Sequence, residues 1–397
     1  MHVVSRCLQE LFEDGGTLFS RRFVRLSVGA AVLSFLTACA AAPVEEEVSI
    51  AYPPEPETPR YYYESTITGS GDVVEDSAGE RFKRFATGET ARGQGFPKPF
   101  GVVAMNGRIY VGDTVARHVA ALDFPGKRFF QFGDSGLGRL AKPLGMAADA
   151  SGRVYVCDGT SKRILVYDPD GQYLKALGGE EMLERPSGVA VNADGSRVYV
   201  VDTGGVRSRN HRVRVFGADG NHLFDIGTRG AGPREFNLPL AAAVGPDGRL
   251  YVLDSGNFRV QVFTPDGDFL FQFGSAGRTP GHFSHPKSIA VDREGKIFVS
   301  DSGFANVQIF DGQGRILMFM GNRSDRGGPG EFILPAGVSV DVDGRVYMVD
   351  QFFRKIDVFR PAGLPEDTPK GQSPAAVTAS STVGVGMDSG PVMTGAN

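Results

Sequence analysis

The chain has 397 residues, with 54 Gly, 24 Pro and no Trp, a hydrophobic share of 41% and a formal net charge of -4. These values place it among ordinary globular proteins with an all-β bias. The small acidic net charge gives no positive field that would attract nucleic acid, so a nucleic-acid partner is not expected.

Residues 1–38 are predicted to form a lipoprotein signal peptide. A basic segment, RRFVR at 21–25, precedes an apolar run at 26–36 and the small residues Thr37 and Ala38. This order is typical of a secretory signal, and the apolar run is too short to remain as a membrane-spanning helix. The segment LTAC at 36–39 resembles a bacterial lipobox, in which the signal is cut before the cysteine and lipid is attached to its sulfur. The alternative is a plain cleavage site next to an incidental Cys39.

The lipobox resemblance implies an exported protein anchored in the bacterial membrane by acylated Cys39. Because Ala40 rather than Asp follows Cys39, it also implies sorting to the outer membrane, facing the periplasm. Loss of the signal peptide removes Cys7, so no intrachain disulfide is expected in the mature chain. Cys157 lies within a predicted strand and is expected to be a buried, unreactive thiol.

Two segments of biased composition flank the predicted main domain at 60–361. Residues 39–59 are rich in Pro and Glu and are predicted to be an extended tether. Residues 362–397 carry almost no large apolar side chains and are predicted to be a disordered tail. A short helix is predicted at 80–86, where Phe82 and Phe85 are three positions apart.

The domain contains six copies of one repeat. A strand ending in Asp recurs at intervals of 44 to 52 residues, at Asp113, Asp158, Asp202, Asp254, Asp301 and Asp350. Each copy has a small-residue strand and a Gly turn before this strand and another strand after it, and an outer strand such as 269–274 usually follows. Because these strands are apolar on both faces, each sheet needs a neighbour on either side. Four strands at this period predict a β-propeller.

The repeat resembles the NHL-repeat family of six-bladed propellers. Its elements are Pro, then GVAVD, GRVYV, DSGN, RVQVF, DG and FG, and the resemblance covers about residues 60–361. It implies an all-β fold: a six-bladed β-propeller of four-stranded antiparallel blades. The sixth copy lacks an outer strand, and residues 61–68 match the outer strands of other copies. We therefore predict that this N-terminal segment completes the last blade and closes the ring.

The six Asp residues are predicted to be architectural. A ring of ligands is the alternative. However, each Asp ends a strand at a tight turn, where a carboxylate accepts backbone N–H bonds. A residue type needed in every blade is explained more simply by the turn than by a ligand.

No metal, cofactor or catalytic residue is predicted. NHL-type propellers that act as zinc lyases present His from several blades, commonly next to the Pro before each innermost strand. In this chain that position holds Phe100, Leu144, Ser187, Leu240, Lys287 and Ala336. His282 and His285 lie near such a position, but both belong to one blade, whereas catalytic zinc takes about three protein ligands. These two histidines are therefore kept only as candidate ligand contacts.

The third copy contains a longer loop than the others. Nine residues separate the Asp from the end of the third strand in five copies, against fourteen in the third. The loop lies on the face of the blade-to-blade connections, where several cations would attract an anionic partner. The alternative is a solvated loop rim. With His282 and His285, the candidate ligand-binding residues are Arg207, Arg209, His211 and Arg234.

Together these features predict a lipid-anchored envelope protein that binds a protein or an anionic polysaccharide and is not an enzyme. The alternative is a metal-dependent lyase or lactonase-like hydrolase with its site at the channel mouth. Other NHL domains bind RNA, but the export signal and the acidic net charge disfavour that role.

Overall fold

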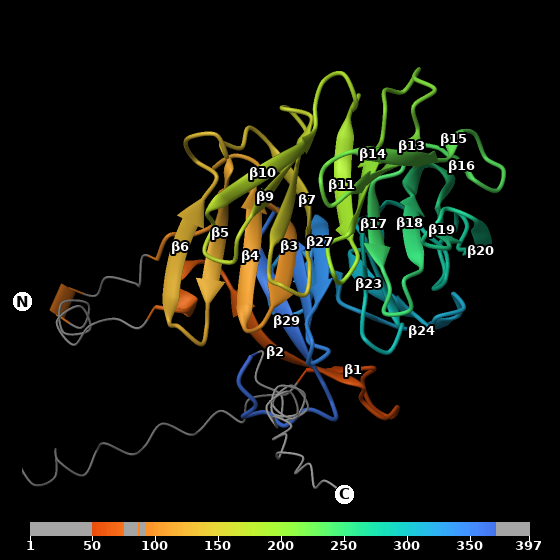
Figure 1. Ribbon diagram of the computed structural model, residues 1–397. Coiled ribbons are helices and arrows are strands. Elements are labelled where there is room, and N and C mark those ends of the chain that lie inside the picture. Colours follow the sequence, from red (N-terminus) through yellow and green to blue (C-terminus); the bar gives the residue numbers. More distant parts are fainter. Residues whose placement is uncertain (1–49, 75–85, 88–92, 371–397) are drawn as a thin grey trace, which may run out of the picture. The chain divides into compact units, whose positions relative to one another are not determined.

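Six antiparallel sheets follow one another along the computed structural model, which describes residues 50–74, 86–87 and 93–370 (Figure 1). Blades 1 to 3 consist of β3 (Pro99–Met105), β4 (Arg108–Asp113), β5 (His118–Asp123) and β6 (Arg128–Phe132); β7 (Pro143–Ala148), β8 (Val154–Asp158), β9 (Arg163–Tyr167) and β10 (Tyr173–Gly178); and β11 (Pro186–Val191), β12 (Arg197–Asp202), β13 (Arg212–Gly217) and β14 (His222–Ile226). Each runs from the innermost to the outermost strand in chain order.

Blades 4 to 6 repeat this plan. They consist of β17 (Ala241–Val244), β18 (Leu250–Asp254), β19 (Arg259–Phe263) and β20 (Phe269–Phe273); β21 (Pro286–Val291), β22 (Ile297–Asp301), β23 (Asn306–Phe310) and β24 (Ile316–Met320); and β27 (Pro335–Val340), β28 (Val346–Asp350), β29 (Lys355–Pro361) and β2 (Tyr61–Ile67). Two connections between blades contain short parallel pairs, β15 (Thr228–Arg229) with β16 (Glu235–Phe236) and β25 (Asn322–Arg323) with β26 (Glu331–Phe332).

The innermost strands form a closed ring. Each of β3, β7, β11, β17, β21 and β27 contacts the next, and β27 contacts β3. Small residues permit this approach: a Cβ added to Gly188 would lie 2.8 Å from the carbonyl oxygen of Leu240, and one added to Gly337 would lie 2.5 Å from that of Phe100. The predicted six-bladed propeller of four-stranded antiparallel blades is confirmed.

Closure by the N-terminal strand is also confirmed. β2 pairs antiparallel with β29, from Tyr61 opposite Pro361 to Ile67 opposite Ile356. In Figure 1 the red β2 lies beside the blue β29. This pairing covers the edge that the sixth repeat would otherwise leave free.

Parts of both predicted flanking segments belong to the last blade. β1 (Ala51–Tyr52), inside the predicted 39–59 tether, adds a fifth strand outside β2, and the ring of Tyr52 meets Phe359 edge-on at 5.5 Å. In the predicted 362–397 tail, the Ala362 amide donates to the Arg60 carbonyl at 2.8 Å. Backbone pairing and aromatic contact therefore order residues whose composition alone predicted a tether and a tail.

The rest of these segments lies outside the described residues, as do the predicted signal peptide at 1–38, Cys39 and nearly all of the predicted 80–86 helix. Among the residues that are described, no helix has the length and hydropathy that a membrane crossing requires.

Each pair of neighbouring blades encloses its own hydrophobic cluster. Between blades 1 and 2, for example, the cluster contains Tyr110, Val119 and Val156. Val111, the neighbour of Tyr110 in β4, is not part of it, because alternate residues of a strand face opposite sides of the sheet. Val111 packs instead toward blade 6, with Val349. This arrangement explains why the middle strands are apolar on both faces. It also holds the blades, and with them the ends of their loops, in fixed positions.

Candidate functional site

The two faces of the propeller differ in the loops that they carry. The loops between the second and third strands of each blade, and the connections between blades, share one face, here called the loop face. The turns between the first and second and between the third and fourth strands form the other, here called the turn face. The strand order within each blade requires this division, because successive strands are antiparallel.

The repeated Asp residues fasten the loop face. Asp301 accepts backbone N–H bonds from His285 at 2.9 Å, in the connection before its blade, and from Gly303 at 2.7 Å, in the following loop. Asp350 does the same for Leu334 and Phe352, at 2.9 and 2.8 Å. The carboxylate thus ties two loops together, and its predicted architectural role is confirmed.

Blade 3 departs from this pattern because its loop is longer. Asp202 accepts from Arg185 at 2.8 Å in the preceding connection. The inserted loop is instead held by Glu184, which accepts from the Gly205 amide at 3.0 Å and from the Asn210 side chain at 2.9 Å. The Ser208 hydroxyl also donates to this carboxylate and is the main reason that the pKa of Glu184 is lowered.

His211 forms the base of the same loop. Its side chain is fully buried, Nδ1 accepts from the Leu238 amide at 3.2 Å, and Nε2 donates to the Gly205 carbonyl at 3.0 Å. Both ring nitrogens are therefore engaged within the protein. His211 was predicted as a ligand contact; in the structure it is buried under the inserted loop and supports it.

Arg209 and Arg234, from the inserted loop and from the connection to blade 4, line one groove of about 490 Å3. Asp225 also lines it, but this carboxylate is already paired with Arg212 at 3.0 Å and Arg214 at 2.9 Å. Glu235 lines it as well, and its carboxylate accepts the amide N–H groups of Ala231 and Gly232 at 2.9 and 2.8 Å. Arg209 and Arg234 form no ion pair with either acid. Arg207 is exposed in the same loop.

The two faces differ in how many of their arginines form ion pairs. On the turn face, cations pair with acids of the turns, as in Arg128 with Asp123 at 2.9 Å and Arg197 with Asp266 at 2.8 Å. On the loop face, several exposed arginines form no ion pair with another described residue: Arg139, Arg185, Arg207, Arg209, Arg234 and Arg278. Exposed Arg60 and Arg293 at the turn face also form no ion pair with another described residue, so unpaired arginines are more numerous on the loop face but not confined to it.

Exposed apolar side chains lie both in the loops of the loop face and on the outermost strands, where Leu174, Leu223 and Phe319 are examples. Val115, Leu137, Val206 and Phe352 are 61, 83, 67 and 59% exposed, and each lies in a loop of this face. In the described part of the turn face, no turn carries an exposed large hydrophobic residue. Apolar residues surrounded by cations on one face are typical of an interaction surface.

The two candidate histidines lie in the connection from blade 4 to blade 5. Nδ1 of His282 contacts the Thr279 hydroxyl at 3.0 Å, and Nδ1 of His285 contacts that of Ser284 at 3.2 Å. Over the described residues, no group of three or more His, Cys, Asp or Glu side chains is placed to hold a metal ion. Cys157 is buried, as predicted, and burial raises the pKa of its thiol.

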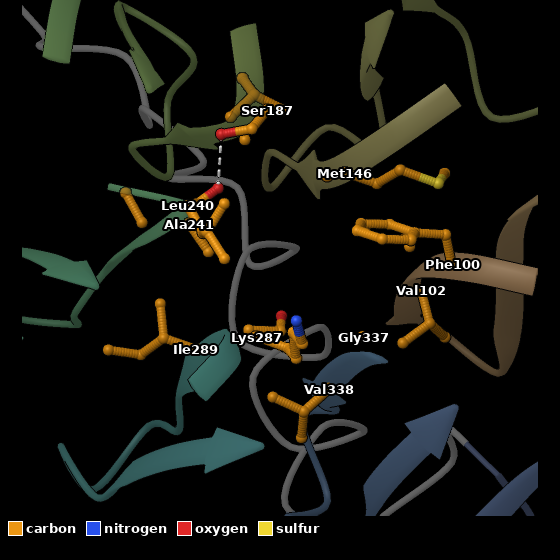
Figure 2. Close-up of a pocket in the computed structure, with 16 residues that line it drawn as sticks. Phe100, Val102, Met146, Ser187, Leu240, Ala241, Lys287, Ile289, Gly337 and Val338 are labelled. Atoms are coloured by element: carbon orange, nitrogen blue, oxygen red, sulfur yellow. Dashed lines mark hydrogen bonds between the residues drawn. The ribbon is translucent and has the colours of Figure 1, made fainter. Parts of the chain in front are cut away.

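The channel contains a cavity of about 220 Å3 at the loop-face ends of the innermost strands, lined by all six blades. Lys287 is the only ionisable residue among the sixteen that line it. Figure 2 shows its side chain inside a ring that includes Phe100, Met146, Ile289 and Val338.

Two residues of this face, Glu184 and Lys287, were not among the predicted contacts. Glu184 holds the inserted loop through tertiary contacts that no local pattern predicts. Lys287 did have a signal in the sequence, because it is the one charged residue at the position that follows the Pro in each repeat.

Comparison with known proteins supports the repeat assignment. The model of the NHL repeat matches residues 183–216 and 236–263, which contain β11, β12, all but the last residue of β13, and β17–β19. A 75-residue stretch is 37% identical to the mouse (Mus musculus) E3 ubiquitin-protein ligase TRIM71 and covers 19% of this chain and 8% of that protein. The chain therefore spans only a small part of this relative.

Two solved structures share the fold. A protein of unknown function from Bacteroides thetaiotaomicron aligns over 75% of each chain with a TM-score of 0.56 and 17% identity. A gluconolactonase from Xanthomonas campestris aligns over 67% of this chain and 88% of its own, with a TM-score of 0.50 and 19% identity. At these identities the likeness shows the fold alone. The chain contains NHL repeats within a six-bladed β-propeller.

Proposed function

We propose that this NHL-repeat propeller is a non-enzymatic binding protein whose loop face holds an acidic protein partner. The observation that carries the proposal is that six exposed arginines of the loop face form no ion pair with another described residue, and that the loops of this face also carry the most exposed apolar side chains, Leu137, Val206 and Val115. Such a surface attracts an acidic partner over a distance and then buries apolar area on contact. NHL-type propellers commonly mediate protein binding, which agrees with this role.

The groove of Arg209 and Arg234 is the proposed centre of the contact. An arginine fork binds a carboxylate through two parallel hydrogen bonds, and hydrogen bonds between charged groups are the stronger ones. Glu184 and His211 restrain the backbone of the loop, so the loop loses little backbone freedom on binding. An anionic polysaccharide is negatively charged, as an acidic protein is, and it is tested below as a competitor for the same surface.

We further propose that the protein works in the bacterial envelope, anchored through acylated Cys39 to the outer membrane. The support is the sequence order of basic segment, apolar run and LTAC at 36–39. Two or more acyl chains would give stable membrane attachment. Mass spectrometry of the mature N-terminus tests this part: a diacylated or triacylated Cys39 is expected, and an unmodified N-terminus elsewhere would reject it.

Binding is tested by recovering partners from envelope fractions of the producing organism. The full-length protein is compared with the double variant Arg207→Glu/Arg209→Glu, and with a turn-face control of equal charge change, Arg249→Glu/Arg293→Glu. We expect one acidic protein to be retained by the wild type and the control and lost by the loop variant, with retention falling as salt rises. Equal recovery by all three proteins would reject the loop face.

Two further measurements separate the alternatives. Acidic polysaccharide added to the same fractions should not displace the protein partner; displacement would favour a glycan ligand. Stoichiometric zinc or calcium in the purified protein, together with turnover of a lactone, would support the hydrolase alternative and contradict the non-enzymatic role.

A further inference from the structure

The cavity in the channel has the properties of a small-molecule site. From its volume of about 220 Å3, it has room for roughly seven waters, at about 30 Å3 each. Its walls include Val102, Met146, Ile289 and Val338, whose side chains are apolar. A cavity of this size takes a ring or a branched chain of a few carbon atoms but no folded segment of a partner. Apolar walls with a few polar groups are typical of ligand pockets.

Lys287 supplies the only charged side chain among the residues that line the cavity. Its side chain is half-buried and makes no hydrogen bond or ion pair with another described residue. The hydroxyl of Ser187, across the cavity, is already engaged, because it donates to the Leu240 carbonyl at 2.8 Å. A cation flanked by apolar walls and lacking an acidic neighbour gains more from an anionic ligand than an exposed cation does, since less water screens the pair.

We infer that this cavity binds a carboxylate carried on a small apolar group, with Lys287 contacting the carboxylate. A single ammonium matches a monoanion in charge. A phosphate, with about two negative charges, is usually met by several cations or by converging backbone N–H groups. The apolar part of the ligand would lie against Phe100 and Met146, which line the same cavity, are half-buried and are drawn with Lys287 in Figure 2.

This site lies at the same face as the proposed partner surface but is formed by other residues. Lys287 lies in the channel, whereas Arg207 and Arg209 lie in the inserted loop of blade 3. The carboxylate belongs either to a free small acid or to the C-terminus of a peptide that enters the channel. Both sources present the same chemistry to Lys287, and the experiment distinguishes them.

The test uses full-length protein with 13C-methyl methionine, whose Met146 signal is assigned with Met146→Leu. Benzoate should shift the Met146 signal in a saturable way. Its neutral isostere benzamide should bind at least about tenfold more weakly, because it cannot form the charged hydrogen bond to Lys287. Lys287→Met should weaken benzoate by the same factor. The control Lys142→Met, an exposed lysine of the loop face, should leave benzoate binding unchanged.

A tripeptide ending in Phe, with a free or an amidated C-terminus, forms the second arm. Binding of the free-acid peptide in addition to benzoate identifies a peptide source, and binding of benzoate alone identifies a small acid. The inference is overturned if benzoate does not bind the wild type in the millimolar range, or binds Lys287→Met as well as the wild type. Arg207→Glu/Arg209→Glu should leave benzoate binding unchanged, so failure of the partner surface and failure of this site give different results.

Discussion

Arg345 donates from Nε to Oε2 of Glu64 at 2.8 Å, although 281 positions separate the two residues in the sequence. Glu64 lies in β2, the N-terminal strand of the last blade, and Arg345 immediately precedes β28 of the same blade. The Arg345 side chain is fully buried, and it also pairs with Asp343 at 3.1 Å and donates to the Thr368 carbonyl. One guanidinium therefore fastens the N-terminal strand and the C-terminal segment to the ring.

Arg345→Met should lower the free energy of unfolding by about 3–5 kcal/mol, because it removes the buried cation that pairs with both Glu64 and Asp343. Chemical denaturation of the full-length protein measures this change. The control is Arg315→Met, which breaks an exposed pair with Asp311 and should cost under about 1 kcal/mol. Similar losses in the two variants would show that the Arg345 contact is not essential to closure.

Gly337→Val should also destabilise the protein, by roughly 1–3 kcal/mol. A side chain at this position would meet the backbone of β3 across the closing contact of the ring. The matched control is Gly363→Ala, since a Cβ there would have no atom within 4 Å. Thermal unfolding compares the two, and an unchanged midpoint for Gly337→Val would contradict the close approach of β27 and β3.

Glu184→Ala should loosen the inserted loop of blade 3, because Gly205, Ser208 and Asn210 all donate to this carboxylate. Hydrogen exchange of loop amides should be accelerated, with Gly205 the clearest reporter. Glu181→Ala, which removes a neighbouring exposed acid, should leave exchange unchanged. If the loop positions the arginines, Glu184→Ala should also weaken recovery of the partner. Unaltered hydrogen exchange in Glu184→Ala would show that Glu184 does not hold the loop.

Asp149 should make stability depend on pH at the acid end. Burial alone would raise its pKa, but hydrogen bonds from Ser151, Tyr155 and Arg153 outweigh burial and lower it. Because the folded pKa lies below the unfolded value, the stabilisation is complete above the unfolded value of about 3.9 and is lost as pH falls through the folded pKa.

Asp149→Asn should therefore be less stable than the wild type at pH 7, and the difference should shrink below about pH 4. Urea denaturation at a series of pH values measures it. A difference that stays constant, or grows, on acidification would contradict the lowered pKa of Asp149.

The repeat pattern was sufficient to predict the number of blades, the strand order and the closing strand, because each depends on local periodicity repeated six times. The sequence also predicted the turn role of Asp301 and its equivalents. It did not predict that Tyr52 and Ala362 belong to the last blade, because their positions depend on pairing with distant segments. For the same reason, composition alone could not distinguish a tether from an added edge strand.

The site was predicted less completely than the fold. Arg209 and Arg234 do line one groove, as their shared face suggested, but the placement of His211 beneath the loop depends on Leu238 and Gly205. Only the packed blades show which cations are already paired. The difference between Arg197, paired with Asp266, and unpaired Arg207 therefore appears in the structure and not in the sequence.

Site-specific photo-crosslinking in the producing organism tests most directly whether the loop face is the binding surface. The photo-reactive residue p-benzoylphenylalanine replaces Val206 in the loop of blade 3 or, as the control, Arg293 in a turn of the opposite face. We predict that illumination joins the Val206 derivative to one acidic protein and that the Arg293 derivative forms no such product. Crosslinks from Arg293 with none from Val206 would contradict the account.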